Sequence, residues 1–254
     1  MSQTDSALAR ALADEAGGLL LDLRRSGGSN MQALRKSGDL LSHQLLTRRL
    51  GEERPTDAVL SEEGVDDTRR LRCDRVWIVD PLDGTREYGE PPRDDWAVHV
   101  ALWERGQLVA GAVARPAAGR TLATDAPPPR PTGTPGVIRL AVSRTRPPQF
   151  VERLAGRLGA QLVPMGSAGV KATAILDDVV DAYVHAGGQY EWDSAAPVAV
   201  ARASGLHTSR IDGSPLEYNR PDPRLPDLLV CRPEIAGVLL TTIADLLSRE
   251  VVAS

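Results

Sequence analysis

The spacing of apolar residues predicts helices at both ends of the chain. Leucines and alanines recur at helical intervals over residues 6–25, and Gly27-Gly28 ends that pattern. A second helical pattern covers residues 40–50 and follows Asp39, which the pattern places at a helix start as a plain N-cap. A third covers residues 233–249. We expect these helices to pack their apolar faces against sheets.

Between these helices, short apolar or alternating runs predict strands. Two of them, residues 96–103 and 107–114, are joined at Arg105-Gly106 and predict an antiparallel hairpin. The other predicted strands are residues 58–61, 76–79, 137–143, 181–185 and 227–231. Further helices are predicted over residues 148–158, residues 172–176, and from Asp193 to near Gly205.

A stretch dense in proline and glycine, residues 123–136, is the predicted boundary between two halves. We therefore expect an N-terminal subdomain of residues 1–136 and a C-terminal one of residues 137–254. Both halves mix helices and strands, which gives a fold class of α+β or α/β.

The strand predicted at residues 76–79 ends in two carboxylates. Asp80 falls at its end, and Pro81 cannot donate a ladder hydrogen bond, so the chain is expected to leave the sheet there. Asp83 then brings a second carboxylate within reach of the first. Carboxylate oxygens are the ligands that hard divalent cations prefer. This segment therefore predicts a metal site.

The next residues add a place for an anion. Gly84 carries no side chain that would keep a ligand from the backbone, and Thr85, with Glu87 behind it, predicts the start of a helix. Free N–H groups at a helix start favour an anion. Aspartate, proline and glycine together are also common in plain turns. The length of the motif behind an apolar strand favours metal-assisted hydrolysis of a phosphate ester.

Three other segments carry candidate chemistry. Glu62-Glu63 follow the strand at residues 58–61 and would deliver carboxylates to the same cleft, although paired glutamates at a strand end are usually solvated. The turn from Gly166 to Lys171 would hold an anion at a helix start, and a simple tight turn explains it equally well. Asp193 opens an alanine-rich helix, where an N-cap is the plain alternative. The charged residues 66–70 read as a solvated loop without a role.

Composition narrows the class of protein. With 42% hydrophobic and 25% charged residues among 254, the chain matches an ordinary soluble globular protein. A formal net charge of −4 argues against a nucleic-acid partner. The cysteines, Cys73 and Cys231, have no metal-ligand spacing and suit a reducing compartment. The sequence shows neither a signal core nor a membrane span, so we expect a cytoplasmic protein.

Three motifs together resemble the inositol monophosphatase superfamily of magnesium-dependent, lithium-sensitive phosphatases. They are Ser61-Glu62-Glu63-Gly64, the run from Trp77 to Thr85 with Tyr88 after it, and Trp192-Asp193-Ser194-Ala195-Ala196. The branch they resemble most is the CysQ-type 3′(2′),5′-bisphosphate nucleotidases. The resemblance implies a layered αβαβα sandwich, a homodimer, and removal of the 3′-phosphate from 3′-phosphoadenosine 5′-phosphate or its sulfated form in sulfate assimilation.

The resemblance also implies roles for individual residues. Two or three Mg2+ ions would bind at Glu62, Asp80, the carbonyl of Leu82, Asp83 and Asp193. Catalytic roles would fall to Asp39, Glu63 and Thr85, with Asp39 orienting the Thr85 hydroxyl, although the family's Thr-x-Ala before that aspartate is missing here. The substrate would contact Glu62, Asp83, Gly84, Thr85, Arg146, Ser167, Lys171, His185 and Asp193.

Two departures concern the substrate. The nucleotidases share a Ser-Arg-Ser-His stretch, which here is Ser143-Arg144-Thr145-Arg146, and His185 stands where they place an arginine. A phosphatase acting on inositol-1-phosphate or fructose-1,6-bisphosphate is therefore the alternative on the same site. An inactive nucleotide-sensing module is a second alternative, which the complete set of carboxylates argues against.

Overall fold

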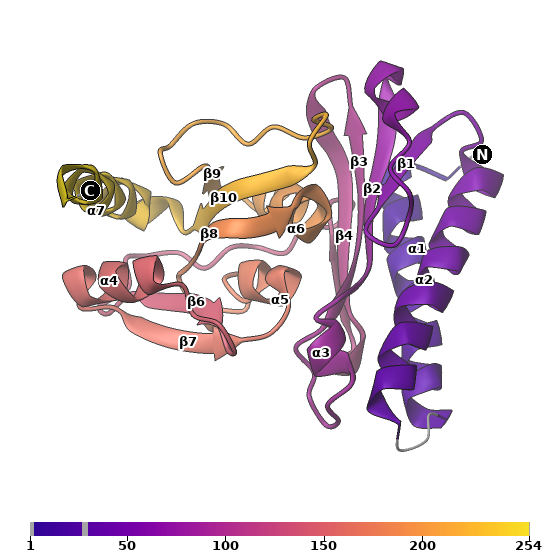
Figure 1. Ribbon diagram of the computed structural model, residues 1–254, viewed down its shortest axis with the longest axis horizontal. Coiled ribbons are helices and arrows are strands. Elements are labelled where there is room, and N and C mark those ends of the chain that lie inside the picture. The colour runs from indigo at the N-terminus through magenta and orange to yellow at the C-terminus, as the bar shows by residue number, and fades with distance from the viewer. Residues whose placement is uncertain (1–2, 27–29, 254) are drawn as a thin grey trace.

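The computed structural model describes residues 3–26 and 30–253, with side chains through residue 248. Five layers follow one another across the molecule (Figure 1). Helices α1 (Asp5–Ser26) and α2 (Met31–Glu53) cover one face of the first sheet, and α6 (Glu191–Ala203) lies between the two sheets. Helices α4 (Gln149–Leu158) and α7 (Pro233–Ala253) cover the second sheet. The predicted layered αβαβα sandwich is confirmed.

The first sheet is built entirely from the N-terminal half, in chain order. Its strands are β1 (Ala58–Ser61), β2 (Arg75–Asp83), β3 (Ala97–Glu104), β4 (Gln107–Arg115) and β5 (Arg120–Ala123). Strands β1 and β2 are parallel, whereas the later neighbours are antiparallel, including the predicted β3–β4 hairpin. The short helices η1 (Thr68–Arg72), α3 (Thr85–Tyr88) and η2 (Pro116–Ala118) lie in its connections.

The second sheet is built from the C-terminal half in the order β7-β6-β8-β10-β9. Its strands are β6 (Arg139–Ser143), β7 (Gln161–Met165), β8 (Ala182–Tyr190), β9 (His207–Ser209) and β10 (Arg224–Cys231). Helix α5 (Ala168–Thr173) follows β7 and begins four residues before the helix that the sequence predicts there. Strands β5, β7 and β9 were not predicted, and the three residues of β9 are too few to show a period. The proposed boundary at residue 136 stays a prediction.

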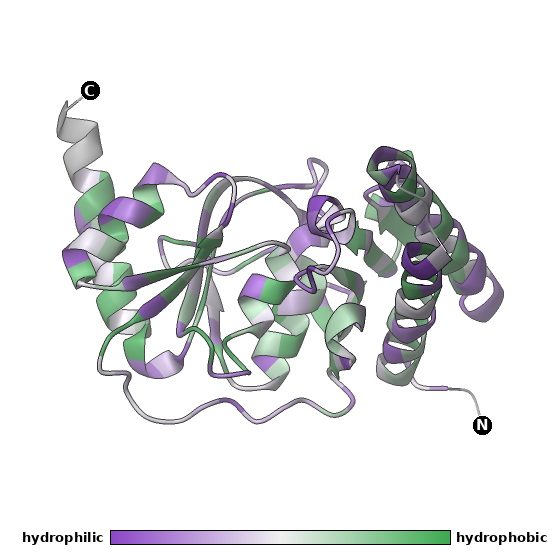
Figure 2. Cartoon of the chain, turned by 90° about the horizontal axis from the view of Figure 1, so that it is seen from below, coloured by the Kyte–Doolittle hydropathy of each residue, from purple (hydrophilic) through white to green (hydrophobic). Residues whose placement is uncertain are grey.

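Three clusters of buried apolar side chains fill the spaces between the layers. One lies under α1 and α2, one lies around α6 between the sheets, and one lies beneath α4 and α7. Hydrophobic and hydrophilic residues alternate around the two N-terminal helices, as amphipathic helices require (Figure 2). Among the described residues, no helix is both long and apolar enough to cross a bilayer. The predicted helix stop at Gly27-Gly28 lies outside the described residues.

Helix α2 corrects the prediction for Asp39. The helix begins at Met31 and is capped by the side chain of Asn30, so Asp39 lies in its middle and is not an N-cap. Gly38 obscured this, because glycine weakens a helical pattern. Neighbouring side chains leave no room for a larger residue at Gly38, because a Cβ at this position would lie 2.8 Å from Tyr88 Cε1 and 3.0 Å from Leu82 Cδ2. The helix therefore passes close to α3 and to the end of β2.

Strand β2 corrects the prediction for Pro81. The strand does not leave the sheet at Asp80 but continues to Asp83, with a shift in register between these two aspartates. Such an irregularity tolerates a proline, because the residues inside it make no regular ladder bonds. Both aspartates stay inside the molecule, with 1% and 7% of their surfaces exposed.

The charged stretch after β1 also differs from its prediction. Arg70 is almost fully buried, and its guanidinium donates to Asp66, to Asn219 Oδ1 at 2.7 Å and to the carbonyl of Arg220 at 2.9 Å. Glu191, the first residue of α6, accepts from the backbone N–H groups of the same Asn219 and Arg220. This stretch therefore ties the two halves together beside the start of α6.

Candidate active site

Four carboxylates from three elements meet between the two sheets. Asp80 and Asp83 come from the end of β2, and Asp193 from the first turn of α6. Glu62 directly follows β1, and its N–H donates to the Val79 carbonyl at 3.4 Å, which brings it beside Asp80 on the parallel strand. The expectation that both strands deliver carboxylates to one place therefore matches the geometry.

The pKa values of three of these carboxyl groups are raised by burial and by the charges of their neighbours. Burial, followed by the charge of Glu62, raises the pKa of Asp80 well above its ordinary value. Partial burial and the neighbouring carboxylates raise the pKa of Glu62 to about 7, and burial with the charge of Asp83 raises that of Asp193 to about 6. Charges crowded in this way are relieved by a bound cation.

Asp83 differs from its neighbours because His99 and residues of the second half of the chain hold it as an anion. Its Oδ2 accepts hydrogen bonds from Ser167 Oγ at 2.5 Å and from the N–H of Gly169 at 2.7 Å. Burial alone would raise the pKa of Asp83, but His99, Lys171 and the Ser167 hydroxyl together lower it. One oxygen is thus used to fix the side chain, which leaves Oδ1 for a cation.

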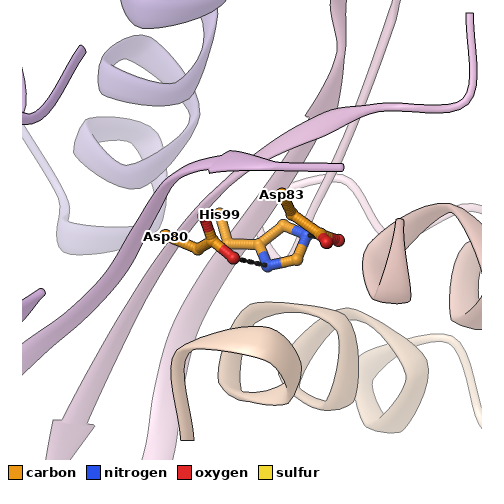
Figure 3. Close-up of side chains that lie close together, drawn as sticks. All are labelled: Asp80, Asp83 and His99. Carbon is orange, nitrogen blue, oxygen red and sulfur yellow. Dashed lines mark ion pairs between the residues drawn. The ribbon is translucent and has the colours of Figure 1, made fainter. Parts of the chain in front are cut away.

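His99 on β3 is a site residue that the sequence analysis missed. Its buried ring lies between Asp80 and Asp83, with Nε2 3.2 Å from Asp83 Oδ2 and Nδ1 4.0 Å from Asp80 Oδ2 (Figure 3). Burial opposes a charge on this ring, but Asp83 raises its pKa overall. The sequence did show a histidine inside an apolar strand. Aligning β2 with β3 pairs this histidine with Asp80.

Ligand atoms of Asp80, Asp83 and His99 lie within 4.8 Å of one another, yet the packing makes the ring a support for the site. Nδ1 lies 3.1 Å from the carbonyl oxygen of Trp192, the residue before Asp193. A Cβ on Gly169 would lie only 2.0 Å from Nε2, so the backbone of α5 closes that side of the ring. The donors that remain, carboxylates and the Leu82 carbonyl, are all hard oxygens and fit a hard divalent cation.

Thr85 and Asp39 meet as the resemblance implies. The Thr85 hydroxyl lies 3.2 Å from Asp39 Oδ1 and 3.0 Å from the Leu82 carbonyl oxygen. Burial, with a smaller contribution from the charge of Glu63, raises the pKa of Asp39 to about 6. Gly84 has φ +84°, a left-handed conformation that glycine adopts without strain, and so turns the chain from β2 into α3.

Asp193 is held by its own helix. It is the third residue of α6, and its Oδ2 accepts the N–H of Tyr190 at 2.6 Å, which corrects the expectation of an N-cap. This bond belongs to a capping box, in which the third helical residue reaches back to the residue before the helix.

Pockets that hold small molecules have volumes of about 300–1,000 Å3. A cavity of 330 Å3, within this range, opens beside the carboxylates. Most of the predicted substrate residues line it: Asp83, Arg146, Ser167, Lys171, His185 and Asp193. A second cavity of 240 Å3, which Gly84 and Thr85 line, adjoins the first. Both cavities share Ser143, Arg146, Ser167 and Lys171 along their common wall.

The basic side chains of the first cavity are not equivalent. Lys171 is buried, and its Nζ donates to the carbonyls of Gly166 at 2.9 Å and Ser167 at 2.8 Å. Burial lowers the pKa of Lys171 and also lowers that of His185, to about 4. His185 is therefore neutral near pH 7 and would contact a substrate as a hydrogen-bonding group, whereas Arg146 remains exposed and charged.

Comparison with known proteins identifies the family of this chain. The family model described as "Inositol monophosphatase family" matches residues 9–126 and 131–248. A "3'-phosphoadenosine 5'-phosphate phosphatase" of Mycobacterium tuberculosis is 54% identical over 243 residues, covering 91% of this chain and 90% of the relative. The protein of that name in Mycobacterium leprae is 50% identical over 255 residues, covering 95% and 94%.

Among solved structures, CysQ from Bacteroides thetaiotaomicron superimposes with a TM-score of 0.74 at 23% identity. The match covers 89% of this chain and 96% of that chain. At this identity the likeness supports the fold alone.

Proposed function

This chain belongs to the inositol monophosphatase family, and from that premise we propose that it is a magnesium-dependent phosphatase that removes the 3′-phosphate of 3′-phosphoadenosine 5′-phosphate and of its sulfated form. The observation that carries the proposal is the 330 Å3 cavity, where Asp83 and Asp193 stand beside Arg146 and Lys171. Acidic groups there suit a metal, and basic groups suit a second anionic group of the substrate.

The carboxylates of Glu62, Asp80, Asp83 and Asp193 and the Leu82 carbonyl would hold the magnesium ions. Bound cations would polarise the attacking water and neutralise charge on the transferred phosphoryl group. When the Thr85 hydroxyl donates its hydrogen bond to Asp39, the lone pairs of the Thr85 oxygen are free to orient that water. Gly84 and Thr85 would donate backbone N–H groups to the phosphate. Glu63, whose charge acts on Asp39, would assist the same step.

We further propose a cytoplasmic homodimer in sulfate assimilation, inhibited by lithium, as the family resemblance implies. Both cysteines are unpaired in the structure, which is compatible with a reducing compartment.

Phosphate release should be measured with magnesium from 3′-phosphoadenosine 5′-phosphate, inositol-1-phosphate and fructose-1,6-bisphosphate at equal concentrations. The nucleotide should be hydrolysed fastest. If phosphate is released faster from either of the other compounds, that compound is the preferred substrate and the nucleotide proposal is wrong. Nucleotide binding without release from any of the three would favour the sensing module.

The metal assignment is tested with the same assay. Excess chelator should abolish turnover, and Asp83→Asn and Asp193→Asn should each remove most of it while circular dichroism still shows a folded chain. The Tyr190 N–H keeps an acceptor in Asp193→Asn, so that helix start is retained. Near-normal activity of either variant at saturating magnesium would show that the ligand set is wrong.

A further inference from the structure

The smaller cavity beside α3 carries more positive charge than the cavity at the carboxylates. We call it the α3-side cavity; Gly84 and Thr85 form one side of it, and its basic lining residues are Arg86, Arg144, Arg146 and Lys171. Glu87 is the acidic residue in its lining, whereas Asp83 and Asp193 both face the larger cavity. An anion remote from the metals is therefore favoured in the α3-side cavity.

Two of these basic side chains already have partners inside the protein. Arg144 donates to Glu87 Oε1 at 2.8 Å and to Glu90 Oε2 at 2.9 Å, so carboxylates neutralise its charge. Lys171 is occupied by the carbonyls of Gly166 and Ser167. These two residues shape the wall of the cavity.

Arg86 and Arg146 are different. Within residues 3–26 and 30–253, neither guanidinium makes a hydrogen bond or an ion pair; their recorded bonds use only the backbone carbonyl of Arg86 and the backbone N–H of Arg146. Both side chains are exposed and line the α3-side cavity. Each can therefore take a new anionic partner without breaking an existing contact.

The backbone under Arg86 is fixed. Arg35 on α2 donates from Nη2 to the Arg86 carbonyl at 3.0 Å. A Cβ on Gly89 would lie 2.3 Å from Arg35 Nε, so this arginine packs tightly against the end of α3. The free side chain of Arg86 thus projects from a rigid base, one residue after Thr85.

We propose that Arg86 is a substrate-binding residue that, together with Arg146, receives the phosphate that is not hydrolysed. A guanidinium binds phosphate through two parallel hydrogen bonds, which suits this role better than the single ammonium of a lysine. The inference rests on the proposed nucleotidase activity and adds Arg86 to it as a residue that selects bisphosphates over monophosphates.

The test compares two nucleotides that differ only in the remote group. Adenosine 3′-monophosphate lacks the 5′-phosphate that 3′-phosphoadenosine 5′-phosphate carries. Arg86→Ala should raise KM for the bisphosphate roughly tenfold or more, with kcat little changed, because one charge-assisted contact is lost. KM for adenosine 3′-monophosphate should change by less than about twofold. Arg86→Lys should fall between Arg86→Ala and the wild type.

Binding gives a second measurement. Adenosine 5′-monophosphate, the expected product, keeps only the remote phosphate, so Arg86→Ala should weaken its competitive inhibition roughly as much as it raises KM for the bisphosphate. The control is Arg72→Ala, which removes an equal charge from an exposed position in η1 and should change neither constant.

The possible failures can be told apart. If wild-type enzyme prefers the bisphosphate but Arg86→Ala affects both nucleotides equally, or neither, the role of Arg86 is wrong and the nucleotidase proposal stands. If the wild type hydrolyses adenosine 3′-monophosphate as efficiently as the bisphosphate, no remote phosphate is recognised. The proposed role of Arg86 and Arg146 then fails, whereas removal of the 3′-phosphate from the bisphosphate stands. If the wild type releases phosphate from neither nucleotide, the nucleotidase proposal itself fails.

Discussion

The Thr85 hydroxyl lies 3.2 Å from the carboxylate of Asp39, 46 positions earlier in the chain. This contact joins the middle of α2 to the start of α3, where the backbone passes from the proposed metal ligands to the proposed phosphate-binding N–H groups. We therefore expect Asp39 to act on the reaction through Thr85, with an effect separable from that of a metal ligand.

Asp39→Asn should lower kcat roughly tenfold or more, in the range found for residues that orient the groups around a metal. Magnesium affinity, measured by calorimetry, should change little, because Asp39 is not among the proposed ligands. A helix cap would behave in the opposite way, with lower stability and unchanged kcat. That result would remove Asp39 from the catalytic machinery.

The pH dependence of stability should also report on Asp39. Its pKa is raised from 3.8 to about 6 in the folded protein, so the folded state holds the proton more tightly than the unfolded chain. The stabilisation is complete below the unfolded value and is lost as pH rises through the folded one. Relative to Asp39→Asn, the wild type should therefore lose unfolding free energy between about pH 4 and about pH 7. The full shift corresponds to about 3 kcal/mol, and the loss should be smaller than this because solvent reaches Asp39 and screens its charge.

Urea denaturation of both proteins in chelator, at the two ends of this range, measures the difference. Comparing the two proteins cancels most of the titration of Asp80, Glu62 and Asp193, which both share. An equal pH dependence in the two proteins would show that Asp39 has an ordinary pKa.

The fold was largely predictable from the sequence, because its helices are amphipathic and its strands are short apolar runs. The errors lie where tertiary contacts override a local rule. Gly38 interrupts a helical pattern only because Tyr88 and Leu82 leave no space for a Cβ, and Pro81 stays in β2 because the strand is irregular there. Sequence reasoning misses such positions, because the reason lies in a distant residue.

The same holds for the site. Carboxylates at strand ends and helix starts were visible as motifs. His99 was not, because its role depends on the alignment of β3 with β2 and on the approach of Gly169 from the other half of the chain. Arg70 was read as solvated because only the folded chain shows Asn219 beside it.

Two glycines of α2 provide a matched test of this packing argument. A Cβ on Gly38 would clash with Tyr88, whereas a Cβ on Gly51 would meet nothing within 4 Å. Gly51→Ala should stabilise the protein by about 0.5–1 kcal/mol through helix propensity. Gly38→Ala should destabilise it by about 1–3 kcal/mol, because overpacking outweighs that gain. The denaturant midpoints of the two variants measure the difference. If both substitutions stabilise the protein, the side chain of Tyr88 moves aside at little cost.

Lys171 and Arg146 line the same cavity, but replacing each by alanine should affect the substrates differently. Lys171 holds the carbonyls of Gly166 and Ser167, and Ser167 in turn holds Asp83. Lys171→Ala should therefore slow hydrolysis of inositol-1-phosphate as well as of the bisphosphate nucleotide, because it disturbs a proposed metal ligand that every substrate needs. Arg146 is exposed and supports no such contact.

Arg146→Ala should raise KM for 3′-phosphoadenosine 5′-phosphate roughly tenfold, and change turnover of inositol-1-phosphate by less than about twofold, since that substrate has no second phosphate. Steady-state kinetics of both variants on both substrates make the comparison. If Lys171→Ala also spared inositol-1-phosphate, its bonds to the two carbonyls would be dispensable, and Lys171 would join Arg146 as a residue that contacts only the remote phosphate. If Arg146→Ala impaired both substrates equally, Arg146 would instead support the common site, and substrate choice would have to arise elsewhere in the two cavities.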